Sequence, residues 1–165
     1  MNKVYYIMGV SGSGKSTIGE ALSKRMNIPF YDSDHFHPVS NIEKMSAGIP
    51  LNDADREPWL NAIRDFAIEQ LPERSVMIAT SALKEIYRQK LDGAIDPEQV
   101  QWIFLHGSYD LLYKRIADRK GHFMPESLLR SQFDTLEIPH RNVISVNVDQ
   151  TVDEIVDEIM ERLQD

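Results

Sequence analysis

The sequence predicts an α/β fold in which helices cover both faces of a parallel sheet. Short apolar runs rich in β-forming residues alternate along the 165-residue chain with segments of helical periodicity. A glycine-rich loop lies directly between the first apolar run and the first helical segment. Strands separated by helices form βαβ units, whose strands are parallel and whose crossovers are right-handed. The length is that of one domain, so we expect a single domain over residues 1–165.

Five segments have the length and apolar composition of buried strands. They are Val4–Met8, Pro29–Tyr31, Val76–Thr80, Val100–Leu105 and Val143–Val148.

The segments between these strands show apolar residues at helical spacing, or residues that commonly start a helix. Trp59, Ile63 and Phe66 recur at helical spacing behind Pro58. Proline is favoured in the first turn of a helix, so we expect this helix to open at Pro58. The other expected helices are Ser16–Met26, a short one around Ile42–Ser46, Leu111–Arg119 with Ser108 or Asp110 near its start, and Pro125–Leu136.

The C-terminal segment carries the clearest helix pattern. Thr151 and Glu154 have the spacing of a capping box, which marks a helix start. The apolar residues behind them lie on one helical face: Val152, Ile155, Val156, Ile159 and Leu163.

Composition narrows the class of protein. The chain has no cysteine, which excludes disulfides and thiolate metal sites. No apolar run approaches the roughly 18 residues of a membrane span, and Val4–Val10 leads into a glycine loop, as a strand does and a signal peptide does not. We therefore expect a cytoplasmic protein. The net charge of −8 argues against nucleic acid as a partner, since proteins that bind it usually carry a basic face.

The glycine loop predicts a nucleotide site. Residues 9–16 read GVSGSGKS and match the phosphate-loop (P-loop) pattern G-x-x-x-x-G-K-[ST] at every fixed position. Backbone N–H groups of such a loop cradle phosphates, the lysine reaches the β- and γ-phosphates, and the hydroxyl after it ligates Mg²⁺. The residues expected at ATP from this loop are Gly9, Val10, Ser11, Gly12, Ser13, Gly14, Lys15, Ser16 and Thr17. GTPases, motors and switches use the same loop, so it does not by itself define a kinase.

Two carboxylates follow the second expected strand. Asp32 and Asp34 are two residues apart and point the same way on an extended backbone. Ligands bind at the carboxyl ends of strands in open α/β sheets. One carboxylate can hold Mg²⁺ through water, while the other orients or deprotonates a substrate hydroxyl. A simple turn is the alternative interpretation. His35 and His37 are also two apart, and for His37 we favour a hydrogen-bonding role near the acceptor over a metal site.

Cations cluster in the last third of the chain. Arg115 and Arg119 share a helix face, and Lys120, Gly121 and His122 follow at once. Cations beside a glycine suit a lid that closes over ATP and neutralises transition-state charge. They also suit a plain helix C-terminus, which is the alternative.

The sequence resembles bacterial gluconokinases of the P-loop, nucleoside-monophosphate-kinase-like group. The matching motifs run in order over nearly the whole chain. They are residues 8–16, 32–34 with 37–38, 41–45, 48–53, 56 with 58–60, 81–84 with 87–88, 119–123, 132–133 and 136–137. Ser33 and His35 depart from the Gly and the acid that are usual in this family, and Thr80 stands where Cys is usual.

The resemblance implies ATP-dependent phosphorylation of D-gluconate to 6-phospho-D-gluconate with Mg²⁺. It implies a three-layer P-loop kinase fold with a five-stranded parallel sheet of order 2-3-1-4-5, a small lid around residues 119–126, and possible homodimerisation. Lys15, Asp34 and Arg119 are implied as catalytic residues, and Ser16 and Asp32 as the magnesium site. The implied ATP contacts outside the loop are Arg115 and Arg119, and the implied gluconate contacts are Asp34, His37, Arg56, Lys84, Arg88 and His122, with Lys120 in the lid.

Three other functions fit a P-loop. Shikimate kinase should show a Gly-Gly-Gly run after the third strand, where this chain has Ser81–Lys84. A nucleoside monophosphate kinase needs an arginine-rich insert, which we do not find. A GTP-dependent switch without an acceptor should carry Asn-Lys-x-Asp, which does not occur.

Overall fold

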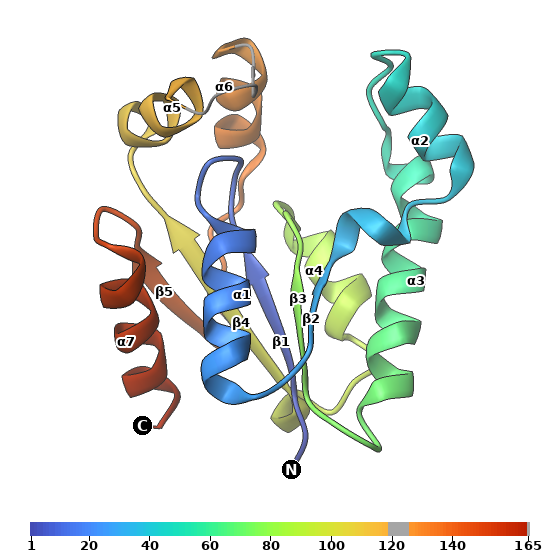
Figure 1. The fold of residues 1–165 in the computed structure, drawn as a ribbon. Helices are drawn as coiled ribbons and strands as arrows, with labels where there is room; N and C mark the ends of the chain where they lie inside the picture. The colour runs from blue at the N-terminus through green and yellow to red at the C-terminus, as the bar shows by residue number, and fades with distance from the viewer. Residues whose placement is uncertain (119–125, 165) are drawn as a thin grey trace.

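A five-stranded parallel sheet forms the centre of the computed structural model, which describes residues 1–118 and 126–164 (Figure 1). The strand order is β2-β3-β1-β4-β5, with every neighbouring pair parallel. The strands are β1 (Val4–Met8), β2 (Phe30–Asp32), β3 (Val76–Ala79), β4 (Val100–His106) and β5 (Val143–Asn147). The predicted fold class and strand order are therefore confirmed, and each predicted strand lies within one residue of its observed bounds.

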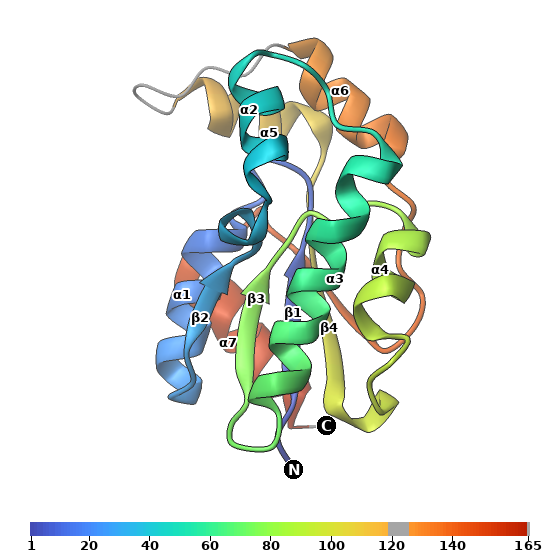
Figure 2. The ribbon, with the colours of Figure 1, turned by 90° about the vertical axis from the view of Figure 1, so that its right-hand side faces the viewer.

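Helices cover both faces of the sheet. Alternate residues of β1 point to opposite sides: Tyr6 and Met8 join one core cluster, and Ile7 joins the other. Helices α1 (Lys15–Met26) and α7 (Val152–Leu163) pack on the Ile7 side. Helices α3 (Asp53–Gln70) and α4 (Glu85–Asp92) pack on the other, as Figures 1 and 2 show. Both faces are thus buried, which is why the strands read as continuous apolar runs.

Helix α3 begins earlier than the sequence predicted. Asn52 caps it and accepts a hydrogen bond from the Asp55 N–H at 2.8 Å, while the Asp55 carboxylate accepts one from the Asn52 N–H at 3.0 Å. This capping box starts the helix five residues before Pro58, which lies inside it. The expectation of a helix opening at Pro58 was therefore wrong, because two side chains that satisfy free N–H groups define the start.

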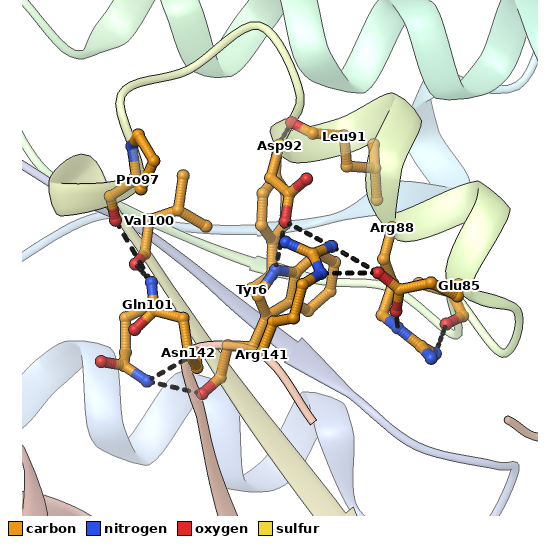
Figure 3. Close-up of polar contacts among 12 residues, drawn as sticks. Tyr6, Glu85, Arg88, Leu91, Asp92, Pro97, Val100, Gln101, Arg141 and Asn142 are labelled. Carbon is orange, nitrogen blue, oxygen red and sulfur yellow. Dashed lines mark hydrogen bonds and ion pairs between the residues drawn. The ribbon is translucent and has the colours of Figure 1, made fainter. Parts of the chain in front are cut away.

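Helix α4 was not predicted, although it shapes one wall of the site. It is short, and buried Tyr87 and Leu91 form its only apolar pair at helical spacing. Figure 3 shows Arg141, which precedes β5, lying between Glu85 and Asp92 at the two ends of α4. Its guanidinium donates to Glu85 at 2.7 Å and to Asp92 at 3.2 Å. These contacts fix α4 against the sheet from outside its own sequence.

Four of the remaining helices lie around the carboxyl ends of the strands: the 3₁₀ helix η1 (Ser33–Phe36), α2 (Val39–Ser46), α5 (Tyr109–Ala117) and α6 (Glu126–Thr135). The 3₁₀ helix η2 (Pro97–Gln99) directly precedes β4, at its amino end. Ser108 caps α5 and the predicted Thr151–Glu154 box caps α7, as expected. The lid expected around residues 119–126 falls almost wholly outside the described residues. No helix in the described part combines the length and apolar character that a membrane span requires.

Candidate active site

The glycine loop joins β1 to α1 at the carboxyl edge of the sheet (Figure 1). Gly12 and Gly14 have φ angles of 83° and 92°, a region that other residues seldom adopt. A Cβ atom on Gly12 would also come within 2.9 Å of the Ile116 side chain. The backbone therefore requires glycine at Gly14, a fixed position of the P-loop pattern, and at Gly12, a variable one. This requirement supports a phosphate-binding loop over a chance match to the pattern.

Lys15 and Ser16 begin α1 at the floor of a cavity of about 360 Å³. The Lys15 ammonium donates to the carbonyls of Gly9 at 2.8 Å and Val10 at 3.2 Å. The Ser16 hydroxyl donates to the Asp32 carboxylate at 3.3 Å. The cavity is lined by residues 11, 12, 14–16, 32–34, 79–81 and 132.

The Ser16–Asp32 pair fits a magnesium ion. A hydroxyl and a carboxylate oxygen are ligands of the kind Mg²⁺ takes in nucleotide sites, where phosphates and waters complete its shell. Among the described residues, no group of three or more His, Asp or Glu could hold a metal without such help. The donor set thus suits a metal that arrives with a phosphate.

Asp34 lines the same cavity, beside Asp32. Partial burial of its carboxyl raises its pKa above the ordinary aspartate value, and the negative charge of Asp32 raises it further. His37, Lys15 and His35 act in the opposite direction. The Asp34 backbone N–H donates to the Asp32 carboxylate at 2.9 Å, which holds that carboxylate beside the Asp34 backbone. A carboxylate with a raised pKa suits a group that accepts a proton during a reaction.

A second cavity of about 160 Å³ adjoins the first, because Ser81 lines both. Its walls carry two of the predicted cations, Arg56 and Lys84. Each lies 5.6 Å from the centre of the Tyr87 ring, and they approach the Asp53 carboxylate at 3.8 and 3.9 Å. Two cations that converge on one carboxylate form a pocket that can bind an acidic ligand.

His37 stands beside this second cavity. Its ring stacks on the Trp59 indole, with centroids 4.4 Å apart and planes 9° apart. Trp59 is buried, lines the cavity, and donates to the Ser33 carbonyl at 2.7 Å. The structure therefore brings His37 and Asp34 to one region, as the sequence suggested.

Arg88 does not line either cavity. Its side chain is 2% exposed, and its guanidinium donates to the carbonyls of Ala82 at 2.7 Å and Glu137 at 2.8 Å and to the Glu85 carboxylate at 3.1 Å. Ala82 has a φ of 41°, which costs energy for a residue with a side chain. In this structure Arg88 therefore holds the strained loop that carries Lys84, and its implied contact with gluconate stays a prediction.

Arg88→Met is expected to lower the free energy of unfolding by about 2–4 kcal/mol, since it removes charge-assisted bonds and leaves the buried Ala82 carbonyl unpaired. Urea unfolding followed by circular dichroism measures the change. The exposed Arg74→Met is the matched control and should stay within about 0.5 kcal/mol of the parent. A stable Arg88→Met protein with a raised KM for the acceptor would instead support Arg88 as a direct contact.

Of the other predicted cations, the structure describes only Arg115. Arg115 on α5 donates to the Val148 carbonyl at 2.5 Å and is absent from the lining of the first cavity. Arg119, Lys120 and His122 lie outside the described residues. The described residues therefore include the phosphate loop, Asp32, Asp34 and the second cavity, whereas the lid stays a prediction.

Gln132 of α6 is a residue of the first cavity that is not among the predicted site residues. Its amide oxygen accepts from the Ser11 N–H at 2.7 Å, and its amide nitrogen donates to the Ser11 hydroxyl at 2.9 Å. Gln132 lies between Leu129 and Phe133 on the inward side of α6. A polar side chain within this apolar stripe is the sequence feature that could have indicated its role. This contact joins α6 to the phosphate loop.

Comparisons with known proteins agree on one class. The family model described as shikimate kinase matches residues 11–164. A probable gluconokinase of Xenopus tropicalis is 44% identical over 90% of this chain and 87% of its own. The thermoresistant gluconokinase of Escherichia coli K12 is 42% identical over 89% of this chain and 85% of its own. The crystal structure of a gluconokinase from Sinorhizobium meliloti is 45% identical, with a TM-score of 0.87 over 98% of this chain and 91% of that one.

Proposed function

Because the chain belongs to the gluconokinases, a family of P-loop kinases, we propose that it transfers the γ-phosphoryl group of ATP to D-gluconate and releases 6-phospho-D-gluconate and ADP. One structural observation carries the assignment of the site. The cavity of the phosphate loop and the cavity of Arg56 and Lys84 share Ser81, so donor and acceptor can lie in contact.

The phosphate loop holds the donor. Its backbone N–H groups surround the β-phosphate, and Lys15 exchanges the Gly9 and Val10 carbonyls for phosphate oxygens. Mg²⁺ bound by Ser16 and Asp32 would neutralise phosphate charge as it develops. Arg115, with Arg119 and Lys120 of the expected lid, would complete this set of cations.

The second cavity holds the acceptor. Arg56 and Lys84 bind the gluconate carboxylate in place of Asp53, and His37 and His122 contact its oxygens. Asp34 takes the proton of the 6-hydroxyl as its oxygen forms a bond to the γ-phosphorus. The bond from that phosphorus to the bridging β–γ oxygen breaks, and ADP leaves with the bond's electron pair. We also infer a cytoplasmic protein and a homodimer, by analogy with the family.

The acid limb of the pH profile of kcat/KM for gluconate should lie above the ordinary aspartate pKa of about 3.9. The pKa of Asp34 is raised, so falling pH protonates it earlier than an ordinary aspartate, and activity that needs its carboxylate is lost there. Asp32→Asn removes a charge that raises this pKa and should move the limb to lower pH, measured at saturating Mg²⁺ and ATP. If the acid limb does not move in Asp32→Asn, protonation of Asp34 is not the cause of the acid limb.

An acceptor panel tests the proposed function. ADP release is measured with gluconate, shikimate and AMP, each with and without Mg²⁺. We expect Mg²⁺-dependent turnover with gluconate alone. Turnover with shikimate or AMP and none with gluconate would refute the proposal. The stretch Ser81–Lys84, which brings Lys84 to the second cavity, argues in advance against shikimate.

A further inference from the structure

A buried amide links His37 to the start of α3. Asn41 on α2 is 1% exposed, although it is polar and lies in a helix whose other residues are mostly exposed. Its amide nitrogen donates to the Asp55 backbone carbonyl at 2.9 Å and lies 3.2 Å from Nδ1 of His37. A buried asparagine with two partners on different elements is a specific arrangement, since an unpaired one would be costly.

The Asp55 carbonyl settles how this amide is oriented. A carbonyl can only accept, so it must face the NH₂ group of Asn41 and not its oxygen. The second hydrogen of that NH₂ group then points at His37 Nδ1. Nδ1 must therefore accept, and a neutral imidazole that accepts at Nδ1 carries its hydrogen on Nε2.

Neighbouring groups hold both ends of this link in place. Asp55 belongs to the capping box of α3 and also pairs with Lys44 at 2.9 Å. The His37 ring lies flat on Trp59. Nε2, the second ring nitrogen, has no hydrogen-bond partner among the described residues, so the Nε2–H is the group left to meet a ligand.

We propose that Asn41 is a positioning residue that fixes His37 as the Nε2–H tautomer, so that His37 donates a hydrogen bond to an oxygen of the acceptor and does not act as the base. The identity of that acceptor as gluconate rests on the proposed function. The tautomer does not, because it follows from Asn41, Asp55 and His37 alone.

The charges around His37 agree with a neutral ring. Partial burial lowers its pKa, and Arg56 of α3 lowers it further, while Asp34 of η1 raises it. A ring that stays neutral keeps one hydrogen, on Nε2. With Nδ1 engaged and Nε2 protonated, neither nitrogen can take the proton of the acceptor hydroxyl, which leaves Asp34 as the base.

Nuclear magnetic resonance reads the tautomer directly in the unmodified protein. Long-range ¹H–¹⁵N correlation spectra of histidine-labelled protein at pH 7.5 separate the two tautomers and the imidazolium, and His37→Gln identifies the signal. We expect the Nε2–H pattern for His37. An Nδ1–H pattern or an imidazolium at this pH would overturn the proposal, whatever the acceptor is.

Variants test whether the tautomer matters for turnover. Asn41→Asp places an acceptor where the donor was, so the His37 signal should change to Nδ1–H when spectra and kinetics are both recorded at a pH that keeps the ring neutral. Then kcat/KM for gluconate should fall roughly tenfold, as for one lost hydrogen bond, while KM for ATP stays constant. Glu43→Gln, an exposed change on the same helix, is the control and should alter neither.

The combination of Asn41→Asp with His37→Gln completes the test. If Asn41 acts through His37, the double variant should be no worse than His37→Gln alone. Effects of the two changes that simply add would overturn the positioning role. An unchanged kcat/KM in Asn41→Asp despite an altered tautomer would do the same. If instead gluconate is not the acceptor at all, the parent protein shows no gluconate turnover, and the tautomer result still stands.

Discussion

Asp34→Asn is expected to lower kcat for gluconate by roughly 10²- to 10⁴-fold, the usual contribution of a positioned general base. The amide keeps the shape of the carboxyl and can still contact the hydroxyl, but it cannot take the proton. KM for ATP should change little, since the phosphate loop is untouched. Steady-state kinetics with gluconate and ATP varied in turn measure both quantities.

Asp65→Asn is the matched control for this variant. Asp65 is exposed on α3, pairs with its neighbour Arg64, and lines neither cavity. It should retain parental kinetics. If Asp34→Asn keeps near-parental turnover while it still binds gluconate, Asp34 is not the base.

Lys15→Met is expected to lower kcat by at least roughly 10²- to 10³-fold, the effect of removing one preorganised charge-stabilising donor. Methionine keeps most of the stem but removes the ammonium that would follow the γ-phosphoryl group. The same kinetic assay measures the loss, and calorimetric titration with ATP shows how much binding remains.

Lys24→Met provides the comparison on the same helix. Lys24 is exposed in the last turn of α1, away from the phosphate loop, and its loss should leave kcat unchanged. A Lys15→Met protein that keeps more than about a tenth of parental kcat would contradict the role given to the loop lysine.

Much of the scaffold could be predicted because its signals are local. A strand buried on both faces is a short apolar run, and the phosphate loop is a contiguous pattern whose glycines meet a backbone requirement. Asp32 and Asp34 could be placed at the first cavity because Asp32 ends β2 and Asp34 follows it, where the fold places ligands. These features need no knowledge of distant partners.

The features that were missed depend on distant partners. Arg88 is a cation of the kind that binds acidic ligands, but its guanidinium donates hydrogen bonds to the carbonyls of Ala82 and Glu137. Helix α4 has a single apolar pair and is fixed by Arg141, which lies far along the chain. The pairing of Asn41 with Asp55 and His37 exists only once α2 and α3 are folded together. Residue type alone cannot distinguish such contacts from exposed polar positions.

The product of the reaction tests the central claim most directly. The protein is incubated with ATP, Mg²⁺ and gluconate, and the ADP released is compared with the NADPH formed when 6-phosphogluconate dehydrogenase and NADP⁺ are added. Transfer to the 6-hydroxyl predicts equal amounts of ADP and NADPH. ADP without NADPH would mean hydrolysis or phosphorylation elsewhere, and it would contradict a site that places the 6-hydroxyl between Asp34 and the γ-phosphate.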